Sequence, residues 1–196
     1  KSQGNSLINN GLKIYYFKVQ GTYLKNILIL RKKILNNKFD IIHSHYSYSA
    51  FLCLLTFTKI PIVVSYMGSD IQGQLQFNVK SLLIYFSNKI IFRITEYFAS
   101  RIIVKSKGLY ELLNYKHKAE IISNGIDFNK FKPMHKIMVR KKLKINTKLK
   151  YILFLANKNN KNKNFKLLED TINLMNDNNL KLLEFNYPLD PNLVPL

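Results

Sequence analysis

The feature that most constrains the fold is an alternation of short apolar runs with longer segments of helical spacing. The apolar runs lie at residues 39–43, 62–66, 101–104 and 120–122. The segments of helical spacing between them are 47–57, 81–100 and 106–113. Short, continuously apolar strands with helical connections are typical of parallel sheets covered on both faces. The sequence therefore predicts an α/β protein of doubly wound type.

Two further elements are predicted before the first run. Residues 13–19 are rich in β-branched and aromatic side chains, which predicts a strand. Thr22 follows Gly21 and is placed to cap a helix to about residue 36. The segment at 81–100 is apolar over much of its circumference, so we expect that helix to be packed beneath other elements.

A second domain is predicted after Pro133. Residues 131–133 look like a boundary, and a basic segment follows at 136–150. The alternation then restarts with a strand at 151–156, a helix at 164–175 and a strand at 180–185, and 189–196 approach a later helix. We therefore expect two domains, 1–132 and 133–196. The second is small for a complete domain of this kind.

Composition excludes some classes of protein and leaves others open. Hydrophobic residues make up 47% of the 196, which suits a globular chain with a core. The net charge of +20 attracts anions such as nucleotide diphosphates, lipid headgroups or nucleic acid, although a compositional bias of the source would also produce it. Cys53 is the single cysteine, so an intramolecular disulfide and a cysteine-based zinc site are excluded.

Polar clusters directly after the predicted strands are the candidate binding residues, because open parallel sheets bind ligands at the carboxyl ends of their strands. In chain order these are His43, Ser44 and His45; Met67, Gly68, Ser69 and Asp70; Asn124, Gly125 and Asp127; and Asn157, Lys158, Lys161 and Lys163.

Each cluster allows a chemical role and a simpler structural one. His43 and His45 could donate hydrogen bonds or act as a base, or only bond to neighbouring backbone. We expect their rings to point to opposite sides of the strand, so that they do not share a metal ion. Residues 68–70 suit close backbone approach, or a turn with a helix N-cap. Residues 157–164 suit a phosphate site at a helix N-terminus, or a solvated basic loop.

The motifs taken in order resemble glycosyltransferase family 4. FDIIHSHYSYSAFL resembles the family's "pDiiHaHy" segment, and PIVVSYMGSDI resembles "pvVvtfHGsD". RIIVKSKGLYELL resembles "aDrvIvvS…l…l", and IISNGIDFNKFKP resembles "viPNGvDl..F.P". YILFLANKNNKNKNFKLLEDTINLM resembles the first strand and helix of the donor domain. The ordered set covers nearly the whole chain.

The resemblance implies a GT-B fold of two Rossmann-like domains, the first handling the acceptor and the second a nucleotide-sugar donor. It implies sugar transfer with retention, without a catalytic metal and with no cofactor besides the donor. By position, Lys163 matches the lysine near the donor diphosphate, where Asn157, Lys158 and Lys161 are further candidates. The catalytic candidates are His45 and Asp70.

Other positions match loops of the family. His43, Gly68 and Ser69 match the acceptor side, and Asn124, Gly125 and Asp127 match the loop between the domains. Met67 stands where many members have a histidine, and a thioether is a poor hydrogen-bonding substitute. The family's first strand would precede residue 1 and its acidic motif would follow residue 196. We therefore expect the chain alone to be inactive.

The expected function is sugar transfer to a glycan or lipid-linked acceptor in cell-surface polysaccharide synthesis. The expected location is cytoplasmic, with peripheral association at the inner face of the cell membrane through anionic lipid. The alternative is a non-catalytic basic module that binds an anionic membrane or nucleic acid. Nucleic acid is the less favoured partner, because the aromatic residues lie mostly in apolar runs that suit a core.

Overall fold

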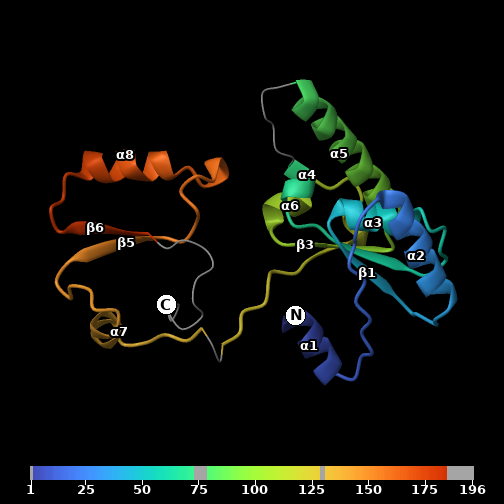
Figure 1. Cartoon of the computed structure of the whole chain (residues 1–196), viewed down its shortest axis with the longest axis horizontal. Coiled ribbons are helices and arrows are strands. Elements are labelled where there is room, and N and C mark those ends of the chain that lie inside the picture. Colours follow the sequence, from blue (N-terminus) through green and yellow to red (C-terminus); the bar gives the residue numbers. More distant parts are fainter. Residues whose placement is uncertain (1, 73–78, 129–130, 185–196) are drawn as a thin grey trace. The chain divides into compact units, whose positions relative to one another are not determined.

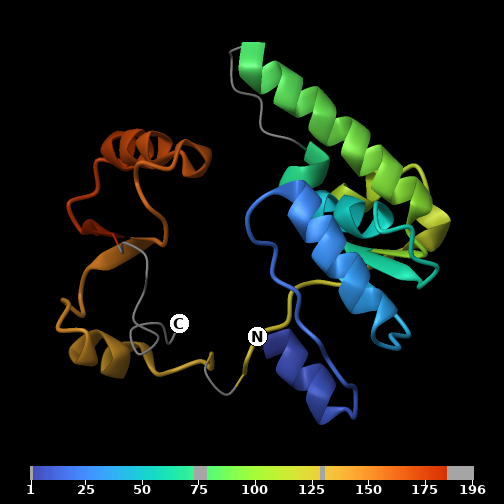
Figure 2. The same cartoon turned by 45° about the vertical axis from the view of Figure 1, so that its right-hand side comes forward.

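The computed structural model describes residues 2–72, 79–128 and 131–184. The chain forms two compact units, Lys1–Gly125 and Ile126–Leu196. Each unit contains its own parallel sheet. Figures 1 and 2 show the elements of the two units from two directions.

The first unit is built on a four-stranded parallel sheet in the order β1-β2-β3-β4. Its strands are β1 (Ile42–His45), β2 (Ile62–Ser65), β3 (Arg101–Val104) and β4 (Ala119–Ile121). All four strands predicted from the apolar runs are therefore present, and the α/β fold class with parallel strands is confirmed. The largest shift is at β1, which begins three residues later than predicted.

Two helices precede β1: α1 (Ser2–Asn9), which was not predicted, and α2 (Tyr23–Leu35), which was. The strands are connected by α3 (Ser47–Leu54), α4 (Ser69–Gln72), α5 (Val79–Phe98), α6 (Lys107–Glu111) and the 3-10 turn η1 (Lys116–Lys118), and α3, α5 and α6 follow the predicted order. Because successive parallel strands lie side by side in chain order, right-handed crossovers place their helices on one face. In Figure 1, α3, α4, α5 and α6 accordingly lie above the sheet.

The strand register assigns side chains to two faces of this sheet. Ser44, Val64 and Ile102 share one row and are at most 5% exposed, so they form the face beneath the helices. The adjacent row points the other way, since alternate residues of a strand face opposite sides. In that row His43 and Arg101 are exposed and Val63 is half-buried. The described residues thus leave the second face more open, contrary to the predicted covering of both.

The predicted strand at 13–19 is wrong, because no strand is formed there. The reason is the absence of a paired neighbour: a strand exists only where another strand accepts and donates its backbone hydrogen bonds. The segment instead lies against α2, where the Asn26 side chain accepts from the backbone N–H of Gln20 at 2.9 Å. Tyr15 also meets the Phe39 ring edge-on at 5.4 Å between centroids.

The expectation that the helix at 81–100 lies beneath other elements is also wrong. α5 buries one side, which includes Phe92, Thr95 and Glu96, while Phe86 and Ile90 are more than half exposed. The buried Glu96 carboxylate accepts hydrogen bonds from the backbone N–H groups of two residues that precede η1, and it pairs with Arg93. This carboxylate therefore fastens α5 to the chain between α6 and η1.

The second unit contains a two-stranded parallel sheet. Its elements are α7 (Lys136–Lys142), β5 (Lys150–Phe154), η2 (Lys161–Lys163), α8 (Phe165–Met175) and β6 (Leu180–Glu184). The two predicted strands and the helix between them are confirmed, and α7 lies in a stretch predicted only as a basic connection. Residues 189–196, predicted to approach a helix, lie outside the described residues. None of the helices in the described ranges is long and apolar enough to cross a membrane.

Candidate functional site

The candidate site in the first unit lies at the carboxyl ends of the strands. All four strands are parallel, so their carboxyl ends lie along one edge of the sheet. The polar residues predicted after β1 and β2 are therefore neighbours in space. The structure places His43 and His45 within β1, and Ser69 and Asp70 begin α4.

Asp70 joins the loops that follow β1 and β2. One carboxylate oxygen accepts from the backbone N–H of Met67 at 3.1 Å and of Gly68 at 3.0 Å. The other accepts from the backbone N–H of Ser47, the first residue of α3, at 3.2 Å. Sequence reasoning allowed a helix N-cap at this position. The Asp70 carboxylate instead bonds to the loop before α4 and to the start of α3. Burial raises the pKa of Asp70, although the backbone N–H donors act in the opposite direction.

The backbone at these two loops has unusual conformations. Gly68 has φ of 111°, a region that glycine adopts readily. Tyr46 has φ of 70° and ψ of 150° between β1 and α3, a conformation that costs a non-glycine residue about 1–3 kcal/mol. The adjacent Ser47 hydroxyl is buried and has no hydrogen-bond partner in the part of the chain that the structure describes. Strain and an unpaired hydroxyl thus occur together at the start of α3.

His43 and His45 form a pair on the open face of the sheet. Their ring centroids are 4.7 Å apart, and His43 Nε2 lies 2.8 Å from the Ser65 hydroxyl. The expectation that the two rings point to opposite sides is wrong, because residues two apart in a strand share a face. The two imidazoles and one hydroxyl can together contact a polar ligand at this edge.

Both histidines are held toward the neutral form. Burial is the main cause of the lowered pKa of His43, and the neighbouring charges of His45 and Lys105 add to it. Burial also lowers the pKa of His45, followed by the charge of Lys105. Neutral imidazole can accept as well as donate a hydrogen bond. Sequence reasoning did not select Lys105, although it directly follows β3 and the rule used for the other strand ends would have found it.

The remaining predicted residues of this side have less defined surroundings. Met67 is half-buried beside the Asp70 carboxylate. Asn124 and Gly125 are exposed at the end of the first unit, and Asp127 is exposed just beyond the division between the units. The structure therefore brings the β1 and β2 clusters together, and it leaves the Asn124–Gly125–Asp127 segment as an exposed connection.

The candidate site in the second unit is the basic loop between β5 and α8. The Asn157 side chain accepts from the backbone N–H of Asn159 at 2.9 Å, which closes a tight turn. Asn164 caps α8 by accepting from the backbone N–H of Leu167 at 3.4 Å. Lys158 forms an ion pair of 3.5 Å with Glu184 at the end of β6. Lys161 and Lys163 are exposed on η2, immediately before the positive end of the α8 dipole.

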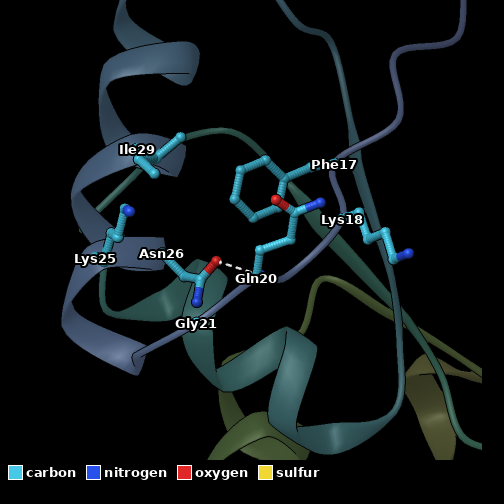
Figure 3. A pocket seen from close by; sticks show the side chains of 7 residues that line it. All are labelled: Phe17, Lys18, Gln20, Gly21, Lys25, Asn26 and Ile29. Carbon is cyan, nitrogen blue, oxygen red and sulfur yellow. Dashed lines mark hydrogen bonds between the residues drawn. The ribbon is translucent and has the colours of Figure 1, made fainter.

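A separate hollow of about 220 Å³ lies between α2 and the segment before it. Figure 3 shows Phe17, Gln20 and Asn26 around this hollow, with Lys18 extending away from it. Asn26 is nearly fully buried, and its side chain donates to the Thr22 carbonyl at 2.7 Å. Its polar groups are thus used to hold the segment against the helix. Among the described residues, no group of three metal-ligating side chains is found.

Comparison with known protein families identifies the family of this chain. The model of the family described as Glycosyltransferase Family 4 matches residues 10–130, which is more than half of the chain. The chain belongs to glycosyltransferase family 4. This match covers the strands and helices that form the carboxyl edge described above. A search of curated protein sequences found no match.

Solved structures support the GT-B fold class. Anabaena HepE in complex with UDP has a TM-score of 0.56 and 13% identity, over 87% of this chain and 53% of that one. The HepE complex with UDP-glucose has a TM-score of 0.52 and 14% identity, over 94% and 59%. A glycosyltransferase from Rickettsia africae ESF-5 has a TM-score of 0.51 and 13% identity, over 98% and 60%. The chain thus spans between 53% and 60% of the length of these proteins.

Proposed function

We propose that this chain is part of a retaining, metal-independent glycosyltransferase that moves a sugar from a nucleotide-sugar donor to a glycan or lipid-linked acceptor. The observation that carries the proposal is the family match over residues 10–130. Residues 1–132 are proposed to form the domain that handles the acceptor, and residues 133–196 the start of the domain that binds the donor. Because the chain spans at most 60% of the length of the HepE and Rickettsia africae proteins, the proposal concerns the whole protein. The proposal includes the expectation that the 196 residues alone do not catalyse sugar transfer.

The donor diphosphate is proposed to lie at the loop before α8. When the sugar leaves, negative charge develops on the diphosphate and must be stabilised. Exposed Lys161 and Lys163 and the N-terminal amides of α8 supply positive charge and hydrogen-bond donors for this purpose. Asn157 and Lys158 contribute less, because their side chains bond to Asn159 and Glu184 within the unit. A lysine and a helix dipole can perform the charge stabilisation that a metal ion performs in other transferases.

The carboxyl edge of the first unit is proposed to hold the reacting groups of the acceptor. A neutral His45 can hydrogen-bond a sugar hydroxyl, and His43 is oriented beside it through Ser65. Asp70 has both carboxylate oxygens occupied by backbone N–H groups, so its geometry favours a positioning role over proton transfer. Gly68 and Ser69 would then form the acceptor-side loop that Asp70 holds, with Met67 in place of the family's usual histidine.

The remaining parts of the proposal rest on the family resemblance and on charge. They are a role in cell-surface polysaccharide synthesis, a cytoplasmic location and peripheral association with the inner face of the membrane. The segment of Asn124, Gly125 and Asp127 is proposed as the connection between the domains, which agrees with its exposure. The net charge of +20 is the one observation that favours the alternative, a non-catalytic module that binds an anionic membrane or nucleic acid.

The test is calorimetric titration of the full-length protein with nucleotide sugars. UDP and UDP-glucose are the first probes, because the HepE structures hold them. Lys163→Ala removes one exposed charge before α8, and we expect it to weaken donor binding by about tenfold. Lys181→Ala is the matched control, since Lys181 is an exposed lysine of the same unit that pairs in register with Tyr151 near the start of β5, away from the loop before α8.

Two outcomes decide between the proposal and its alternative. Donor binding that Lys163→Ala weakens and Lys181→Ala leaves unchanged supports a diphosphate site at this loop. If no nucleotide sugar binds to the full-length protein, the transferase proposal is wrong and the basic surface serves another partner. Equal weakening by both substitutions would show only a general effect of charge, and would remove Lys163 from the site.

A further inference from the structure

The α2 helix presents an exposed stripe of leucine side chains. Leu24, Leu28 and Leu35 are 76%, 68% and 74% exposed. Their spacing of four and seven residues places them on one side of a helix. The opposite side of α2 carries Asn26, Leu30 and Ile34, which are buried against the rest of the first unit. Both sides of this helix are therefore apolar, and one of them faces solvent.

The flanks of the leucine stripe are basic. Exposed Arg31 and Lys32 lie three and four residues after Leu28, so each is its neighbour on the helix surface. Exposed Lys25 adds a third cation near the N-terminal end. The 13 residues of α2 contain no acidic side chain. In the part of the chain that the structure describes, α5 also exposes apolar residues, but its Arg93 is paired with Glu96 and its Lys89 lies over the Tyr85 ring.

We propose that the leucine stripe of α2 and its flanking cations form a docking surface for an anionic lipid bilayer. Leucines between cations match the interface of such a membrane, where acyl chains accept apolar groups and headgroups accept positive charge. α2 lies at the surface of the first unit, at the right-hand edge of Figure 1. Charge complementarity favours lipid over a second copy of this chain, because two such helices would bring cations together.

This inference deepens the proposed peripheral location and is independent of the proposed chemistry. It names the helix that meets the membrane, which net charge alone does not. A purely electrostatic association would be spread over the whole surface of a chain of net charge +20 and would not depend on two leucines. The test therefore changes the apolar side chains and leaves every charge in place.

The first measurement uses tryptophan fluorescence. The chain contains no tryptophan, so Leu28→Trp introduces a single probe within the stripe. We expect its emission to shift to shorter wavelength with vesicles of phosphatidylcholine and phosphatidylglycerol, and not with phosphatidylcholine alone. Leu174→Trp is the matched control: Leu174 is an 86% exposed leucine of α8, a helix that also carries Glu169 and Asp170. Its emission is expected to stay unchanged.

The second measurement is co-sedimentation with the same vesicles. Leu24→Ser with Leu28→Ser preserves net charge, and we expect it to weaken partition by about tenfold because two apolar side chains no longer enter the interface. Leu167→Ser with Leu174→Ser on α8 should have no such effect. Far-UV circular dichroism checks that both pairs fold, which is expected for exposed positions.

Several results would overturn the proposal. These are an unshifted Leu28→Trp emission, an equal shift of Leu174→Trp, or full binding by the Leu24→Ser and Leu28→Ser pair. Self-association in the absence of vesicles, removed by that pair, would show that the stripe is an interface between copies. None of these measurements involves a nucleotide sugar, so failure here leaves the donor-binding test to be decided separately.

Discussion

Removing the Asp70 carboxylate should loosen the candidate site and destabilise the first unit. The carboxylate accepts three backbone hydrogen bonds, from Met67, Gly68 and Ser47, at 3.0–3.2 Å. Hydrogen bonds to charged groups contribute about 1.5–3 kcal/mol each, but water can reach this half-buried side chain. We therefore expect Asp70→Ala to lower the free energy of unfolding by about 3 kcal/mol, or about 1 kcal/mol per bond.

Asp70→Asn separates the hydrogen bonds from the charge. The amide retains one acceptor oxygen for the loop after β2, but its NH₂ group would meet the Ser47 N–H, which is also a donor. Because burial raises the pKa of Asp70, neutralising the group recovers part of its desolvation cost. We expect a loss of about 1 kcal/mol, smaller than for alanine.

Urea denaturation followed by circular dichroism measures both free energies, and amide hydrogen exchange locates the effect. The N–H groups of Ser47, Met67 and Gly68 should exchange faster in Asp70→Ala than in the unchanged chain. Asp170→Asn, at an exposed carboxylate in an ion pair with Lys166, should change stability by less than about 0.5 kcal/mol. If Asp70→Ala left stability and these three exchange rates unchanged, the assignment of Asp70 as the link between the loops would be refuted.

Two further results are expected. Because the pKa values of His43 and His45 are lowered in the folded state, the unfolded chain binds protons first, so unfolding free energy should fall as pH drops below about 6.5. Urea midpoints at about pH 7.5 and about pH 5 measure this, and replacing both histidines with Gln should reduce the difference. Glu96→Ala should cost about 3 kcal/mol, because it removes the acceptor of two part-buried backbone N–H groups and the partner of the half-exposed Arg93. Glu169→Ala on the exposed side of α8 should have little effect by the same urea assay.

The strands of the first unit could be predicted because their sequence signals are local. β2 lies between Pro61 and Gly68 in a run of apolar residues, and β3 is an apolar run between a long helix and a capping serine, Ser106. Both begin at the predicted residue. The segment at 13–19 has an equally strong local preference, yet it forms no strand because pairing depends on a neighbour elsewhere. Local pattern therefore predicts where a strand can form and not whether it is paired.

The same distinction explains what sequence reasoning gave for the candidate site. The positions of His45, Gly68 and Asp70 after apolar runs indicated one edge of a sheet, and the structure places His45 at the end of β1 and Asp70 in α4 shortly after β2, whereas His43 lies within β1. The direction of the Asp70 carboxylate depends on how the starts of α3 and α4 meet, which 23 residues of sequence separation do not reveal. The loop before α8 is different, because its turn and cap are made by Asn157 and Asn164 themselves.

This difference affects how the candidate site in each unit would respond to substitution. Around Asp70, three bonds connect separate loops, so one substitution should displace several groups and its effects should not be additive. In the basic loop, Lys161 and Lys163 are exposed and the turn is held by asparagines, so each charge can be removed without moving the other. Substituting lysines in the second unit therefore tests donor binding more directly than any substitution at the carboxyl edge of the first.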